Sequence, residues 1–349
     1  MKSKRKKYGL LLILILSLFA ANCYRREVGR EPEQDIFVFA PPATWDAVQK
    51  PLEDVFSAGI ETPQYEKYFN LKYVSNPDDL DKYTLHRNLM FVATLDSKGP
   101  IADLVKKSIS SSKTMTGVKQ GKNFLFKKEN QWVNDQVILL LISVNADSLA
   151  KKIERFKQQI FNIYNDQYEK QLKKEMFASH ENKKLEEELL NKYQWTVRVQ
   201  HDYFVAWESP DTGFVFLRRM YPERWFYGRW IDTDNPSLIT KDWILNERDS
   251  VGTWFYGGDV INRKYVKFKI VNFNNRRAYQ VDGLWENNEK VAGGPFREYV
   301  FYDEPTSRIY IIDCAVFDPK DLYGKMPYMR QLDVMARSFK TLVDIQKEK

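Results

Sequence analysis

The chain has 349 residues, of which 43% are hydrophobic and 29% are charged, a balance typical of globular proteins. This composition excludes a disordered chain, a collagen and a polytopic membrane protein. The formal net charge is +7, but five of the positive charges lie in residues 2–7, which we expect to be removed with an export signal. The basic charge therefore gives no reason to expect nucleic-acid binding.

The first 23 residues have the three parts of an export signal. Basic residues come first, then the apolar run 10–16, and then the small residues Ala20 and Ala21 shortly before Cys23. The apolar stretch is shorter than a typical transmembrane helix and has the length of the hydrophobic region of a signal peptide. The sequence up to Cys23 resembles a bacterial lipoprotein signal, in which the cysteine after the cleavage site receives the lipid.

The resemblance implies a signal peptide in residues 1–22, lipidation of Cys23 and a polar tether over residues 23–34. A plain secretory signal with an incidental cysteine is the alternative. With an anchor of several acyl chains the attachment would be stable. We expect an exported lipoprotein that faces the periplasm, at the outer rather than the inner membrane.

Cysteine usage fits this expectation. Cys23 and Cys314 are the only two cysteines, whereas exported proteins that use disulfides usually carry several. Cys314 lies in the apolar strand pattern 308–316, so we expect a buried and unreactive thiol.

The first half of the mature chain mixes strands and helices. Apolar runs predict strands at 35–40, 69–74, 88–95 and 132–143, and three- and four-residue spacing predicts helices starting at Thr44, at Gly99 and after Asn145. Residues 110–121 have the composition of a loop. The last of these helices is interrupted at residues 177–182, where we place a domain boundary.

The second half is mainly β. Helices are expected at 183–193, at 241–250 and around Leu332 near the end of the chain. The expected strands are 195–200, 203–208, 214–220, 265–273, 278–285, 296–302 and 309–317. This order predicts an α+β fold with antiparallel sheets packed against helices, rather than a doubly wound parallel sheet. Two consecutive α/β-sandwich-like subdomains, 35–178 and 179–349, are expected.

Motifs for catalysis are missing from the sequence. The three histidines, His86, His180 and His201, fall in different elements, and neither a Gly-x-Ser-x-Gly motif nor a glycine-rich phosphate loop occurs. We therefore expect no metal, no cofactor and no catalytic residue. Carboxylates such as Asp303 and Asp313 leave a hydrolase open as an alternative, which would require two carboxyls across a cleft.

One segment combines aromatic and basic residues. Such a segment either packs in the core and at strand edges, or forms a surface that stacks on sugars or binds a partner protein. The candidate binding residues are Arg218, Arg224, Trp225, Tyr227, Arg229 and Trp230.

Four sequence segments together resemble a family of uncharacterised bacterial envelope lipoproteins, described as a domain of unknown function. They are residues 85–92 (LHRNLMFV), 131–132 (QW), 283–296 (GLWENNEKVAGGPF), and 329–332 (MRQL) with 338–340 (SFK). The likeness covers residues 35–341 and implies location and architecture but no activity.

Taken together, these patterns predict a lipid-anchored envelope protein that serves as a non-catalytic binding or assembly accessory. Its expected partners are the membrane, through the anchor, and another envelope protein or a glycan. A glycan- or small-ligand-binding protein and a carboxylate-dependent envelope hydrolase are the alternatives.

Overall fold

The computed structural model describes residues 34–178, 181–287, 289–321 and 324–348. The predicted signal, the lipidation site Cys23, the tether up to residue 33 and His180 lie outside the described residues. Contacts divide the described chain into two compact units. The first consists of residues 34–55 and 69–164, and the second of residues 56–68 and 165–348.

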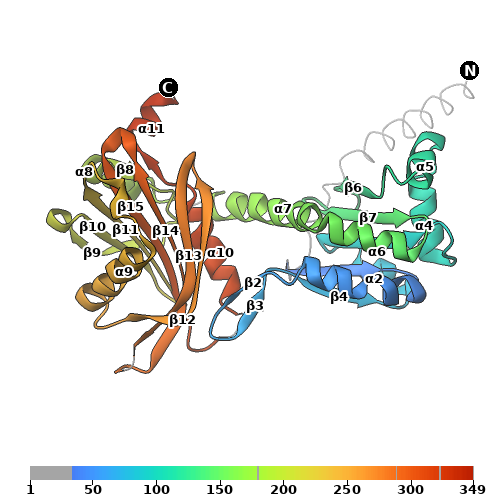
Figure 1. Ribbon diagram of the computed structural model, residues 1–349, viewed down its shortest axis with the longest axis horizontal. Helices are drawn as coiled ribbons and strands as arrows, with labels where there is room; N and C mark the ends of the chain where they lie inside the picture. The colour runs from blue at the N-terminus through green and yellow to red at the C-terminus, as the bar shows by residue number, and fades with distance from the viewer. Residues whose placement is uncertain (1–33, 179–180, 288, 322–323, 349) are drawn as a thin grey trace, which may run out of the picture. The chain divides into compact units, whose positions relative to one another are not determined.

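The first unit contains a five-stranded sheet (Figure 1). Three of its pairings, β4 with β1, β1 with β5 and β5 with β7, are parallel, and only β6 runs antiparallel to its neighbour β7. In spatial order the strands are β4 (Asn70–Val74), β1 (Asp35–Phe39), β5 (Asn88–Thr94), β7 (Val137–Ser143) and β6 (Leu125–Glu129).

Helices connect the parallel strands of this unit. The segment 110–121, expected as a loop, contains α5, whose N-cap Ser111 accepts a hydrogen bond from the Thr114 amide. The helices are α2 (Pro42–Val55), η1 (Pro77–Asp79), α3 (Leu80–Tyr83), α4 (Pro100–Ser108), α5 (Ser112–Lys119) and α6 (Ala146–Arg155).

The parallel arrangement explains why β5 and β7 are buried at every position. Phe91 packs with α4 on one face of the sheet, while Met90, which points to the opposite face, is also fully buried. Parallel strands are buried on both faces because the crossover helices cover them, and such strands are apolar throughout. For β4, β1, β5 and β7 the structure therefore differs from the antiparallel arrangement expected from the sequence.

The second unit contains a seven-stranded sheet in which every pairing is antiparallel. In spatial order its strands are β12 (Val260–Phe273), β13 (Arg276–Asn287), β14 (Ala292–Asp303), β15 (Arg308–Phe317), β11 (Glu223–Asp232), β10 (Phe214–Arg219) and β9 (Phe204–Ser209). Two short pairs complete the unit: β8 (Trp195–Thr196) with β16 (Lys340–Thr341), and β2 (Gly59–Glu61) with β3 (Tyr65–Lys67).

Helices pack on both faces of this sheet (Figure 1). Residues of α8 and α10 belong to one core, which includes Trp195 and the fully buried Cys314, and residues of α9 belong to the other. The helices are α8 (Lys183–Tyr193), η2 (Pro210–Thr212), η3 (Pro236–Leu238), α9 (Lys241–Phe255), η4 (Glu304–Thr306), α10 (Met326–Ala336) and α11 (Leu342–Lys347). The predicted α+β class with two subdomains is confirmed, and the predicted antiparallel arrangement holds for the large sheet of the second unit. The predicted burial of the Cys314 thiol is also confirmed.

The division between the units differs from the boundary expected at residue 178. It falls inside α7 (Lys157–Phe177), between Tyr164 and Asn165, and residues 56–68 belong to the second unit. This segment forms the β2–β3 hairpin, whose Ile60 is buried in the core that also contains α10.

Glu66 of this hairpin caps α10. Its carboxylate accepts hydrogen bonds from the backbone N–H groups of Lys325, at 2.9 Å, and Met326, at 2.8 Å. The N-cap residue of α10, Lys325, makes no capping bond with its own side chain. A carboxylate at a helix N-terminus satisfies otherwise unpaired N–H groups and interacts favourably with the helix dipole.

We expect Glu66→Ala to lower the free energy of unfolding of the second unit by about 1–2 kcal/mol, because both N–H groups lose their acceptor. Urea unfolding monitored by tryptophan fluorescence measures the change. Gln64→Ala is the control, since the exposed side chain of Gln64 lies in the same hairpin. An unfolding midpoint unchanged in Glu66→Ala would show that the cap does not stabilise α10.

Candidate functional site

The aromatic and basic segment forms the end of β10, a turn, and β11. Side chains alternate between the two faces of a strand. Trp225, Tyr227 and Arg229 therefore point to the α9 face, and Arg224 and Trp230 point to the opposite face, toward α10 and α8. Arg218 of β10 lies opposite Trp225 in the ladder and points to the same face. The structure thus separates the six predicted binding residues into two groups.

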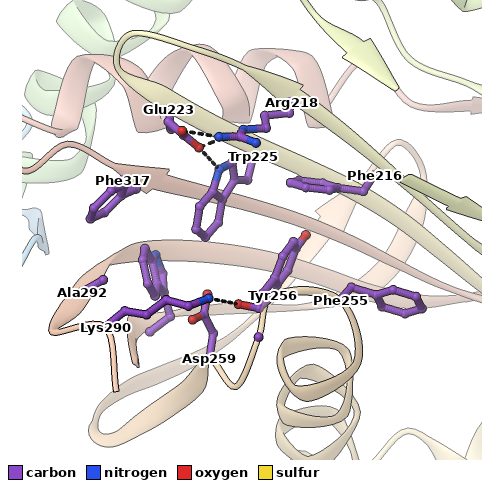
Figure 2. Close-up of a pocket in the computed structure, with 12 residues that line it drawn as sticks. Phe216, Arg218, Glu223, Trp225, Phe255, Tyr256, Asp259, Lys290, Ala292 and Phe317 are labelled. Carbon is purple, nitrogen blue, oxygen red and sulfur yellow. Dashed lines mark hydrogen bonds and ion pairs between the residues drawn. The ribbon is translucent and has the colours of Figure 1, made fainter. Parts of the chain in front are cut away.

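A pocket of about 560 Å³ opens on the α9 face of this sheet (Figure 2). Of the predicted binding residues, Arg218 and Trp225 line it. The other walls come from the end of α9 and the segment after it, the β13–β14 hairpin and the end of β15. These walls contribute Phe255, Tyr256, Gly257, Asp259, Trp285, Lys290, Ala292 and Phe317, and β10 and β11 add Phe216 and Glu223.

The Trp225 indole is the centre of an aromatic cluster in this pocket. Its ring centroid lies 5.3 Å from that of Tyr256, nearly parallel at 17°, and 4.9 Å from that of Trp285. Phe317 stacks at 6.4 Å. Trp225 Nε1 donates a hydrogen bond of 2.8 Å to Glu223 Oε2, which fixes the indole orientation.

Charged groups lie on opposite sides of the aromatic cluster. Arg218 donates from Nε to Glu223 Oε2 at 2.9 Å on one side, and Lys290 and Asp259 lie on the other (Figure 2). Asp259 accepts a hydrogen bond of 2.7 Å from Asn287 Nδ2, and burial raises the pKa of the Asp259 carboxyl. The two cationic and two anionic side chains balance each other in formal charge.

A glycine turn brings Tyr256 and Asp259 to the pocket. Gly257 and Gly258 both have positive φ, +71° and +95°, a conformation that glycine adopts without strain. The Lys290 ammonium donates to the Tyr256 carbonyl at 3.4 Å. A Cβ on Gly257 would lie 2.5 Å from that ammonium, so the turn and the lysine fit together closely.

The other four predicted residues contact the interior and do not line this pocket. Arg224 donates to Gln331 Oε1 at 2.6 Å, and Arg229 pairs with Glu247 of α9 at 2.9 Å. Trp230 packs on Tyr193 and Trp195. Tyr227 donates to Glu298 Oε1 at 3.0 Å.

A buried polar cluster lies between α9 and the sheet. Arg248 of α9 donates to Asp313 Oδ2 of β15 at 2.8 Å, and its guanidinium covers the Phe296 ring. Burial, together with the nearby Asp313 carboxylate, raises the pKa of Glu298 to about 8. Both members of the ion pair are almost completely buried, and this pair connects the helix to the sheet.

The two carboxylates considered for a hydrolase, Asp303 and Asp313, are both held in buried ion pairs. Asp313 is bound by Arg248, and Asp303 is bound by Arg276 Nε at 2.6 Å and by the Thr306 hydroxyl. Each is 1% exposed, and neither lines the pocket around Trp225.

Sequence reasoning missed most of the pocket. Glu223 lies in the aromatic and basic segment but is not among the candidate binding residues. The remaining lining comes from other parts of the chain and includes Tyr256, Asp259, Trp285, Lys290 and Phe317. Two signals were present: the Gly257–Gly258 pair beside an aromatic residue, and the GLW and GGP motifs, which the β13–β14 register places opposite each other.

Within the described residues, no group of three or more His, Cys, Asp or Glu side chains is arranged to hold a metal ion. No helix among these residues has the length and apolar character needed to span a membrane.

The raised pKa of Glu298 predicts a pH-dependent stability. Between pH 4.5, the ordinary pKa of a glutamate, and about pH 8, the folded chain binds the Glu298 proton and the unfolded chain does not. The stability contributed by this group therefore falls as the pH rises through this window and is constant above it.

Glu298→Gln keeps an oxygen acceptor for Tyr227 and does not ionise. We expect its unfolding free energy to increase relative to that of the wild type across this pH window, by a few kcal/mol at most. Urea unfolding as a function of pH measures the difference, with the exposed Glu304→Gln as the matched control. A difference independent of pH would contradict a protonated Glu298 in the folded chain.

Two family models match the chain. Residues 31–177 match a domain of unknown function (DUF8532), and residues 181–338 match a second domain of unknown function (DUF4837). None of the curated protein sequences matches this chain.

Solved structures show only distant similarity. The Ran-binding protein Mog1p of Saccharomyces cerevisiae is 12% identical, with 43% of this chain and 90% of that chain covered and a TM-score of 0.31. LpqN of Mycobacterium tuberculosis, a protein involved in cell envelope biogenesis, is 13% identical, with 42% and 82% covered and a TM-score of 0.26. Similarity at this level supports no conclusion about function. The expected resemblance to an uncharacterised family is confirmed to this extent: two consecutive regions of the chain match domains of unknown function.

Proposed function

We propose that this protein is a lipid-anchored protein of the bacterial cell envelope that binds a carbohydrate, without catalysis, in the pocket around Trp225. The observation that carries the proposal is the lining of this pocket, where an aromatic cluster is flanked by two cationic and two anionic side chains.

This lining fits the chemistry of a sugar ring. Small-molecule sites are concave and mostly apolar, with a few polar groups that fix the orientation of the ligand. The C–H faces of a pyranose pack on aromatic rings, and its hydroxyls both donate and accept hydrogen bonds. Carboxylates such as Asp259 accept from hydroxyls, and the Lys290 ammonium donates to them. Because the formal charges balance, the pocket favours a polar ligand without a strong net charge.

The contacts of the carboxylates favour binding over hydrolysis. A retaining or inverting glycosidase needs two carboxyls on either side of the scissile bond, free to exchange protons or attack. Of the two carboxylates in the pocket, Glu223 is held by Arg218 and by the Trp225 indole, and Asp259 accepts a hydrogen bond from Asn287. Asp303 and Asp313 are buried in ion pairs away from the pocket.

The location is proposed from the N-terminal sequence. Residues 1–22 as signal peptide and Cys23 as the acylated residue would attach the chain to a membrane, most simply the outer membrane, facing the periplasm. There a glycan of the envelope is an accessible ligand, and another envelope protein is the alternative partner. We expect no nucleic-acid partner.

Carbohydrate binding is testable with the chain lacking its first 23 residues. Titration calorimetry against α-1,4-glucose, β-1,4-glucose and β-1,4-N-acetylglucosamine oligomers is expected to detect binding to at least one series. Trp225→Ala should weaken it at least about tenfold, or ~1.4 kcal/mol.

Two further variants make this result interpretable. Lys290→Ala removes an exposed rim charge and should weaken binding, and its thermal unfolding is measured to confirm that the variant is folded. Trp132→Ala, which removes a partly exposed indole of the first unit, should bind as the wild type does. If no oligomer bound the wild type, or if Trp225→Ala and Lys290→Ala bound as tightly as the wild type, a carbohydrate site in this pocket would be ruled out.

The anchor is tested separately in a Gram-negative expression host. Cys23→Ser is expected to abolish incorporation of labelled palmitate and to move the protein from the membrane fraction to the soluble periplasmic fraction, because the thiol is the lipid acceptor. Cys314→Ser is the matched control and should remain labelled. Unchanged labelling of Cys23→Ser would refute lipidation at this residue.

A further inference from the structure

A second pocket, of about 450 Å³, lies beside the first. It is lined by the turn between β10 and β11, by the segment that follows β15, and by Tyr328 of α10. Both pockets include Glu223 and Phe317 in their walls. The two cavities are therefore neighbours within the second unit.

The sheet register explains the shared wall. Glu223 is the first residue of β11 and Phe317 is the last residue of β15, and the two are paired across the antiparallel ladder. Directly opposite residues in such a ladder point to the same face. Because Glu223 and Phe317 line both cavities, the two pockets share a wall at the end of the two strands.

Aromatic side chains continue from one pocket into the other. The rings of Tyr256, Trp225 and Phe317 follow one another at 5.3 and 6.4 Å. Beyond the wall the lining continues around the end of the sheet with Tyr221, which is 87% exposed, and with Tyr328 of α10, which packs against the core on the opposite face. The second pocket also has charges of both signs, from Glu223, Asp318 and Lys320, so its chemistry matches that of the first.

We propose that the two pockets form one groove that binds consecutive residues of a linear oligosaccharide, with one subsite at Trp225 and a second at Tyr221 and Tyr328. This inference rests on the proposed carbohydrate binding. Each cavity alone lies within the range of about 300–1,000 Å³ that small-molecule sites occupy, so the groove has room for more than one sugar ring. The ligand is therefore a stretch of glycan chain rather than a single monosaccharide.

The test is the dependence of affinity on oligomer length. Calorimetry is carried out with the same three oligosaccharide series, from the monosaccharide to the hexasaccharide. In the series that binds, we expect the affinity to rise at least about tenfold from the shortest binding oligomer to a plateau, because the second subsite adds contacts until the groove is filled.

Variants of the second subsite identify the groove. Tyr221→Ala and Lys320→Ala change exposed side chains and should reduce the affinity for long oligomers to that for short ones, while the affinity for short oligomers stays as in the wild type. Trp225→Ala should weaken the binding of both. Circular dichroism and thermal unfolding confirm that each variant is folded.

The outcomes separate the two proposals. If short and long oligomers bind equally, or if Tyr221→Ala and Lys320→Ala leave the binding of long oligomers unchanged, the groove is refuted and the carbohydrate site at Trp225 stands. If no oligosaccharide binds, both proposals fail. Binding of extended peptides in place of oligosaccharides would also overturn both.

Discussion

The buried ion pair between Arg248 and Asp313 connects the helix beside the pocket to the sheet. It connects α9 to the middle of β15, and both side chains are almost completely removed from water. Removing one partner from such a pair leaves an unpaired buried charge, which costs about 3–5 kcal/mol, so the helix is held in one position. The chain leaves α9 directly into the segment that carries Tyr256 and Asp259, and these residues therefore lie opposite Trp225.

The alternation of side chains along β11 is the second constraint. Both faces of this strand are covered, by α9 on one side and by α10 and α8 on the other, so aromatic and basic residues occur at successive positions without an apolar–polar alternation. For this reason the pattern did not identify residues 223–232 as a strand. It is also why a single segment supplies Trp225 to the pocket, Trp230 to the opposite core, and Arg229 to an ion pair with α9.

The second unit is discontinuous because residues 56–68 contact segments that lie far away in the sequence, and local sequence patterns do not indicate such contacts. Residues 56–68 come between the first two strands of the first unit's sheet along the chain, yet Ile60 is buried with α10 and Glu66 caps that helix. These pairs are separated by about 260 residues. A short hairpin has too few residues for a strong periodic signal, and its place is decided by the surface on which it packs.

The sequence by itself determined many of the local elements and the class of the fold. Helical spacing predicted α8 over 183–193, and apolar runs predicted the strands from β13 to β15. Both signals arise because the burial of a helix or strand leaves a regular pattern of apolar residues along the sequence. The sequence also indicated the segment that contains Arg218 and Trp225.

Only the tertiary structure decided the strand direction in the first unit and the membership of the pocket. A run such as β7, buried on both faces, is equally apolar in a parallel and in an antiparallel sheet, so its direction depends on the helices that cover it. Trp225, Tyr256 and Phe317 meet because the sheet register and the position of α9 bring distant segments together. Contacts between such segments arise from packing, and the spacing of residues along the chain does not encode them.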